Sequence, residues 1–109
     1  MAEAPKNFGG ALTTTPTTVY TCPLGKTAMV TLFHVTNVDG VNDADLFASW
    51  FDASDSDAEN RFAHATQVKA KGSFHALERP LNLEGGDYIK ASASADGDLE
   101  LTGSVVEIS

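Results

Sequence analysis

Cysteine is almost absent from the chain, and no long apolar run interrupts it. Cys22 is the single cysteine among 109 residues, so stability must come from core burial and sheet hydrogen bonds rather than from an internal disulfide. No neighbouring cation or motif activates its thiol, and we interpret it as a small apolar strand residue. The apolar runs are far shorter than the roughly 20 residues of a membrane-spanning helix. The N-terminus lacks the basic start and apolar stretch of a secretory signal, which predicts synthesis in a cytoplasm.

Basic residues are also scarce. Fifteen acidic side chains stand against seven basic ones, which gives a net charge of -8. The seven Lys and Arg residues are scattered along the chain, whereas phosphate binding needs a clustered positive surface. We therefore expect neither a nucleic acid nor an anionic membrane as a partner.

Catalytic motifs are missing, and the sequence predicts a protein that is not an enzyme. It contains no G-x-S-x-G, P-loop, G-x-G-x-x-G or C-x-x-C pattern. His34, His64 and His75 stand in separate predicted strands without the close spacing of zinc ligands. We expect packed or surface histidines, and neither a metal nor a cofactor.

An acidic loop imitates the start of a calcium-binding loop. Asp55, Asp57 and Glu59 have the alternating spacing of an EF-hand. The sixth position is Asn60 instead of glycine, and the twelfth is Thr66 instead of glutamate. The flanking helices are missing as well, so we interpret residues 52–60 as a solvated loop.

Strand periodicity dominates the rest of the chain. The longer segments are rich in Val, Thr, Ile and aromatic residues and show no helical apolar stripe. Short turns at 39–43, 69–71 and 95–98 predict hairpins, with 44–52 as the antiparallel neighbour of 26–38. Pro80 interrupts a strand, and Gly85-Gly86 marks a tight turn. The sequence predicts an all-β antiparallel sandwich, immunoglobulin-like or jelly-roll-related, with seven to nine short strands at about 12–15, 17–22, 26–38, 44–52, 61–68, 72–77, 87–94 and 99–108.

The first ten residues differ from the body of the chain. They contain Pro5, Gly9 and Gly10 and have no strand pattern of their own. A frayed terminus is one interpretation. In an assembly, the same segment becomes an extended arm that docks Phe8 on a neighbour. We expect an arm at 1–10, a single sandwich domain at 11–109, and a melting temperature that hardly changes when the arm is removed.

Alternation along 44–52 divides its side chains between two faces. Leu46, Ala48 and Trp50 form one set, which suits the core because an inward Trp fills a two-sheet sandwich well. We expect a core built mainly from this set and from other alternating positions. Its expected members are Val30, Leu32, Leu46, Trp50, Leu77, Leu83, Ile89, Leu101 and Val105.

Apolar side chains also occupy the opposite face, where a free sandwich is polar. Phe47 and Phe51 point away from the expected core, and Phe33 does the same on the preceding strand. Either loops or the N-terminal segment cover this face, or it is a protein–protein interface. The second explanation predicts an interface that contains Phe8, Phe33, Phe47 and Phe51.

Four segments of the sequence resemble a known group of proteins. VYTCPLGKTAMV, HVTNVDG, ASWFDAS and LERPLNLEGGDYIKASASADGDLE are similar to short β-sandwich virion proteins of tailed bacteriophages and related marine and cyanobacterial phages. Those proteins share the ordered elements T-C/A-P-x-G-K-T-A, N-V-D-G, W-x-D-A and L-x-L-x-x-G-D. The resemblance covers about residues 17–108 and has no counterpart for residues 1–15. The elements fall on residues 21–28, 37–40, 50–53 and 81–87.

The resemblance implies a structural component of a phage particle, present in many copies in the virion. A decoration or cement protein packed on the major capsid protein is the first hypothesis, with a homo-oligomer on the particle. The acidic charge agrees with it, because such a protein must stay soluble before assembly. A neck or tail structural protein is the second hypothesis. The third is a carbohydrate- or host-receptor-binding module that uses Phe47 and Phe51 as stacking platforms.

Overall fold

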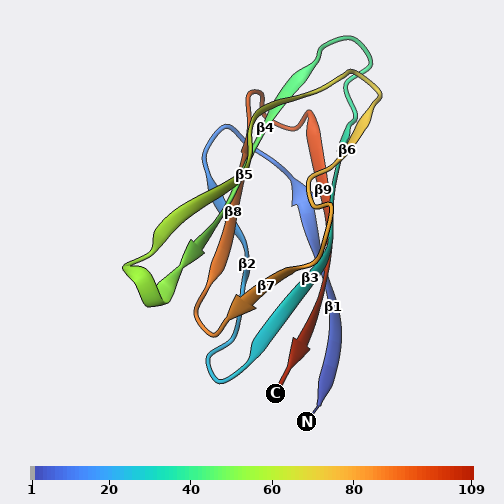
Figure 1. The fold of residues 1–109 in the computed structure, drawn as a ribbon. Helices are drawn as coiled ribbons and strands as arrows, with labels where there is room; N and C mark the ends of the chain where they lie inside the picture. The colour runs from blue at the N-terminus through green and yellow to red at the C-terminus, as the bar shows by residue number, and fades with distance from the viewer. Residues whose placement is uncertain (1) are drawn as a thin grey trace.

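The computed structural model, which describes residues 2–109, places nine β-strands in two antiparallel sheets that pack face to face (Figure 1). This confirms the β-sandwich. No helix among these residues is long and apolar enough to cross a membrane. The elements are β1 (Glu3–Ala11), β2 (Thr17–Thr21), β3 (Thr27–Asn37), β4 (Ala44–Asp52), the 3-10 helix η1 (Ala53–Asp55), β5 (Ala58–Val68), β6 (Ser73–His75), β7 (Leu81–Glu84), β8 (Tyr88–Ala93) and β9 (Leu99–Ile108).

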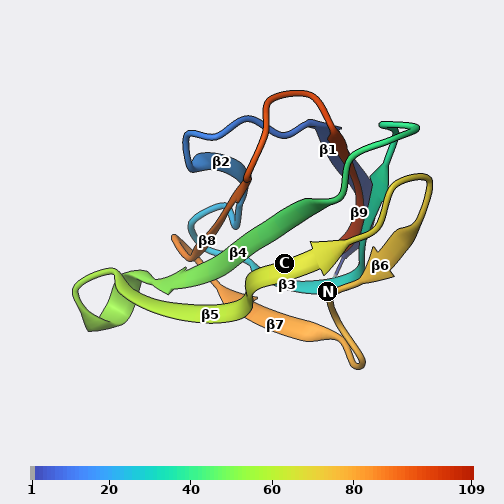
Figure 2. The same ribbon diagram turned by 90° about the horizontal axis from the view of Figure 1, so that it is seen from above.

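The strand order identifies the sandwich as a jelly roll. Sheet I has the order β1-β9-β3-β6, with β7 also on β3, and sheet II has the order β2-β8-β4-β5 (Figure 2). Because β6 and β7 pair with successive parts of β3 and are separated by Pro80, they act as one interrupted edge strand. Eight strands in two sheets remain, which is the jelly-roll count.

The three predicted hairpins are wrong. The connections at 39–43, 69–71 and 95–98 each carry the chain from one sheet to the other, so 44–52 does not pair with 26–38. Among residues 2–109, β4 and β5 are the one pair of consecutive strands bonded to each other. The buried side chain of Asn37 holds two of these crossings together, because its Nδ2 donates to the carbonyls of Val68 (2.9 Å) and Asn42 (3.0 Å).

The N-terminal segment forms a strand, contrary to the sequence-based expectation. β1 pairs with β9 along its whole length, from Glu3 opposite Ile108 to Ala11 opposite Glu100. Pro5 is tolerated because β1 lies at the edge of its sheet, where one row of backbone groups needs no partner. Residues 12–15, expected as a strand, are not one, and β5 begins at Ala58, inside the expected loop. Met1 lies outside the described residues.

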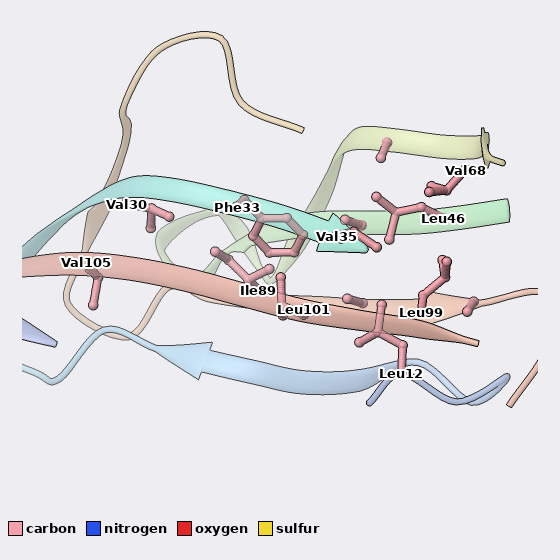
Figure 3. Close-up of a cluster of buried hydrophobic side chains, with 14 of the residues drawn as sticks. Leu12, Val30, Phe33, Val35, Leu46, Val68, Ile89, Leu99, Leu101 and Val105 are labelled. Atoms are coloured by element: carbon pink, nitrogen blue, oxygen red, sulfur yellow. The ribbon is translucent and has the colours of Figure 1, made fainter. Parts of the chain in front are cut away.

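The core fills the space between the two sheets (Figure 3). Val30, Leu46 and Ile89 are fully buried there, as expected from alternation. Leu83, Leu101 and Val105 are also buried as expected, whereas Leu32, Leu77 and Trp50 are partly exposed. The largest side chains with less than 2% exposure are Phe33, Leu46, Leu83, Ile89, Leu99, Val30, Val35, Val68 and Val105.

A β-bulge explains why simple alternation predicts the wrong face for Phe33. Val30 and Leu32 of β3 lie opposite the consecutive residues 104–105 of β9, so Thr31 is an extra residue. An extra residue shifts the alternation by one and exchanges the two faces of the strand beyond it. Phe33 therefore points inward and is 1% exposed, while Leu32 points outward.

Each of the four sheet edges is irregular. β2 has a register shift between Thr18 and Tyr20, and β5 has two shifts opposite residues 46–49 of β4. The β6–β7 edge is broken around Pro80, and β1 contains Pro5. Bulges and prolines at an edge disturb the row of backbone groups that another strand would need for pairing.

Candidate interaction surface

Aromatic side chains gather on the outer side of sheet II. The alternation of β4 turns Leu46 inward and Phe47 and Phe51 outward, as the sequence predicts. Tyr88 of β8 lies directly opposite Phe51, and their rings stack with centroids 4.9 Å apart and planes 2° apart. We call the outward cluster of Phe47, Phe51, His64, Tyr88 and Lys90 the aromatic face.

A lysine lies over the stacked pair. The Nζ of Lys90 is 5.5 Å from the centroid of the Phe51 ring and 5.9 Å from that of Tyr88. Both distances are within the range of cation–π attraction, and the aliphatic stem of the lysine covers part of the rings. The ring of His64 meets Phe47 edge-on at 5.6 Å. A hollow of about 60 Å³ lies between Phe47, Phe51 and Lys90.

Polar groups of β4 and β5 border the aromatic face. Ser49 Oγ donates to Glu59 Oε2 at 2.7 Å, and Arg61 Nη2 lies 3.4 Å from Glu59 Oε1. An apolar centre with a charged border is the usual anatomy of a protein–protein interface. The arrangement offers packing area and stacking to a partner.

The other two predicted interface residues pack on the core, Phe33 fully buried and Phe8 partly buried. Phe33 is in the core, and Phe8 closes the side of the sandwich beneath β1. The ring of Phe8 stacks on Tyr20 at 5.4 Å, lies 6.2 Å from Phe33 and covers Gly103. The structure thus brings Phe47 and Phe51 to one surface and packs Phe8 and Phe33 within the chain. A partner contact at Phe47 and Phe51 stays a prediction.

Sequence reasoning missed a buried carboxylate that joins three strands. The side chain of Glu107 on β9 is 2% exposed, and its Oε2 accepts a 2.7 Å hydrogen bond from Tyr20 Oη of β2. Its Oε1 lies 3.0 Å from Lys6 Nζ of β1 and 3.9 Å from Lys26 Nζ. Tyr20 and Glu107 are 87 positions apart, so no local motif could reveal the pair.

Glu107 and Tyr20 shift each other's pKa in opposite directions. The hydrogen bond from Tyr20, followed by the contact with Lys6, holds the pKa of Glu107 below its ordinary value. Burial, and after it the hydrogen bond to Glu107, raises the pKa of Tyr20 well above its ordinary value. Both effects favour a charged carboxylate and a neutral phenol, so the cluster is a structural anchor for β1.

Cys22 is packed in the core, and two of the three histidines stack on each other. Cys22 is 1% exposed, and burial raises the pKa of its thiol, which makes the reactive thiolate scarce. His34 and His75 lie opposite each other on β3 and β6, with rings stacked at 4.3 Å. Within residues 2–109, no group of three or more His, Cys, Asp or Glu side chains could hold a metal ion.

Acidic loop residues shape the turns that contain them. Asp39 Oδ1 accepts from the backbone N–H groups of Val41 (2.8 Å) and Asn42 (3.1 Å), and these hydrogen bonds lower the pKa of Asp39. Asp43 Oδ1 accepts from the N–H of Ala70 at 2.9 Å. The carboxylates therefore act as turn acceptors.

Comparison with known proteins finds likeness at the level of the fold. No protein-family model and no curated protein matches the sequence. A chain of the Bacillus endospore appendages, described as disulfide-linked pili, superposes with a TM-score of 0.59 at 7% identity, covering 98% of this chain and 87% of that one. A chain of the T13 infectious bursal disease virus particle gives 0.54 at 11% identity, and one of the VP2 subviral particle gives 0.50 at 11%.

The viral chains are much longer than this one. The match covers 95% and 98% of this chain but 31% and 33% of theirs, so the chain spans about a third of their length. At such identities the likeness shows a shared sandwich architecture.

Proposed function

We propose that this chain is a non-enzymatic virion structural protein, specifically a decoration or cement protein that packs on the major capsid protein through its aromatic face. The observation that carries the proposal is the aromatic face itself. Phe47, Phe51 and Tyr88 occupy the outer side of an antiparallel sheet, where a free sandwich has polar residues. All three side chains are partly exposed, and apolar patches on an outer face are a mark of contact surfaces.

The fold and the charge support the same proposal. The similar solved chains come from viral particles and from pili, which are both assemblies. The net charge of -8 favours solubility before assembly and attraction to a basic lattice surface. Burial of one Phe or Tyr contributes about 1.5–3 kcal/mol, so the aromatic face supplies modest binding energy for each copy. Simultaneous binding of several linked copies to a lattice would strengthen attachment. The proposed location is the virion, with the chain as a homo-oligomer on the particle.

The test compares substitutions on the two outer faces. Capsids that lack the protein are mixed with the wild type, with Phe51→Asp, or with Thr102→Asp, whose residue is exposed on the outer side of sheet I. We expect stoichiometric recovery of the wild type and Thr102→Asp with capsids, and loss of Phe51→Asp although its circular dichroism is unchanged. Normal recovery of Phe51→Asp would place the contact elsewhere. Recovery with necks or tails, or saturable glycan binding without capsid binding, would replace the proposal by one of those functions.

A further inference from the structure

A pocket opens between the two sheets at the end of β4. Its volume is about 350 Å³, and it lies where Trp50 and Asp52 of β4 face the β3–β7 pair. This volume is within the range of small-molecule and side-chain binding sites. The pocket explains why Trp50 is partly exposed although its strand turns it inward: one part of the side chain contacts the core and another forms the pocket wall.

One part of the pocket is apolar and the other acidic. Trp50, Met29 and Ile108, which are partly exposed, contribute apolar surface. Asp52, Glu84 and Asp87 contribute three carboxyl groups, and no Lys or Arg is found among the described residues of the lining. The electrostatic potential of such a pocket opposes anions and favours cations.

Asp87 fixes an acidic group at the pocket. It is 4% exposed, and its two carboxylate oxygens accept hydrogen bonds from the backbone N–H groups of Ala53 (3.0 Å) and Glu84 (2.9 Å). Within residues 2–109 no ion pair involves Asp87. The backbone thus orients the carboxylate without supplying a counter-charge, and an entering cation would provide one.

We infer that this pocket binds the arginine or lysine side chain of a partner protein. The aliphatic stem packs on Met29 and Ile108. The charged head lies beside the acidic lining and the indole of Trp50, the ring that attracts cations most strongly. The inference rests on the proposed function in taking a protein as the source of the cation. It names a contact separate from the aromatic face and is tested on the free protein.

The single tryptophan makes the test direct. Trp50 is the only Trp of the chain, so its fluorescence reports on the pocket and the adjoining core with no second indole to obscure it. N-acetyl-arginine amide and N-acetyl-lysine amide are expected to change the emission saturably, with a Kd of about 1 mM that weakens with added salt. N-acetyl-citrulline amide, neutral and nearly the same shape as the arginine probe, should leave it unchanged. An equal response to citrulline or to methyl glucoside, or no saturable response to the cations, overturns the inference.

A second comparison identifies the source of the cation. A Gly-Arg-Gly peptide with blocked ends should bind at least as tightly as methylguanidinium, a free cation with the same head group and the same single charge. Tighter binding of methylguanidinium than of any arginine peptide would point to a free cation and overturn the protein source.

Variants with matched charge complete the test. Asp52→Asn combined with Glu84→Gln removes two acidic groups from the pocket, and we expect at least about a tenfold weaker Kd for the arginine probe. Asp57→Asn combined with Glu78→Gln changes the net charge equally at exposed positions outside the lining and should leave the Kd unchanged. If both pairs weaken the Kd equally, overall charge explains the effect and the pocket is not a specific site.

The capsid test and the pocket test can give different results. A protein that does not bind capsids but binds the arginine probe and not the citrulline probe would refute the proposed function and support the pocket.

Discussion

At the scale of single residues, the contact between Phe8 and Gly103 makes a sharp test of packing. A Cβ at Gly103 would overlap the ring of Phe8, which is held between Tyr20 and Phe33 and cannot easily move. We expect Gly103→Ala to destabilise the domain by about 1–3 kcal/mol in urea unfolding.

The matched control places the same change beside a smaller neighbour. With Phe8→Ala present, Gly103→Ala should be neutral or stabilising, because alanine lowers the entropy of the unfolded chain relative to glycine. If Gly103→Ala lowers the free energy of unfolding equally with and without Phe8, backbone geometry and not Phe8 requires the glycine.

Glu107 and Tyr20 predict how stability depends on pH. The folded-state pKa of Glu107 is lowered, so its contribution is complete above its ordinary value of 4.5 and is lost as pH falls through the folded-state pKa. The pKa of Tyr20 is raised, so its contribution is complete below its ordinary value of 10.0 and is lost as pH rises beyond it. We expect a plateau of the melting temperature between these values.

Two substitutions test the acid and the alkaline declines of melting temperature separately. Glu107→Gln should lower the plateau yet flatten the decline towards acid, and Tyr20→Phe should flatten the alkaline decline. Melting curves followed by circular dichroism measure both. An acid decline as steep in Glu107→Gln as in the wild type would assign it to other carboxyl groups.

At the scale of elements, strand β1 is expected to be essential for stability. Deleting residues 2–11 removes Phe8 from the core, takes Lys6 from the buried Glu107 and exposes the edge of β9. Burial of Phe8 alone contributes about 2–3 kcal/mol. With about 4–8 °C per kcal/mol for a domain of this size, the melting temperature should fall by at least about 10 °C.

This outcome is opposite to the one that the sequence predicts for an independent arm. Pro5→Ala, an exposed change in the same strand, is the control and should leave the melting temperature nearly unchanged. A truncated protein that melts like the full chain would show that β1 is only loosely attached in solution.

Alternation and turn residues predict most strand positions but not their pairing. The segments 26–38, 44–52 and 99–108 agree closely with β3, β4 and β9. Short turns usually join antiparallel neighbours, yet here they cross between sheets, and the ties that fix the crossings, such as Asn37 to Val68, join distant residues. Alternation predicts the outward direction of Phe47 and Phe51, because β4 is regular at these positions. It fails for Phe33, because the bulge at Thr31 exchanges the two faces of β3.

At the scale of the whole molecule, net charge controls association of the free protein. The charge of -8 at neutral pH falls to zero near the isoelectric point of about 4.5. We expect a monomer at pH 7 and low salt, and association through the aromatic face as the pH approaches 5. Static light scattering measures this, and Phe51→Ser should associate less than Thr102→Ser at the same pH. Equal association of the two variants would exclude the aromatic face as the self-contact.

The irregular edges decide how copies of this molecule can meet. A straight edge strand lets a second chain extend the sheet, which is the route to fibrils and to misassembly. Here the bulges of β2 and β5, the break at Pro80 and the proline of β1 each disrupt that row of backbone groups. Many copies can therefore accumulate without templating one another, and an ordered array must join them through side chains on the flat faces. Such contacts are reversible, so a copy that lands in the wrong orientation can leave and bind again.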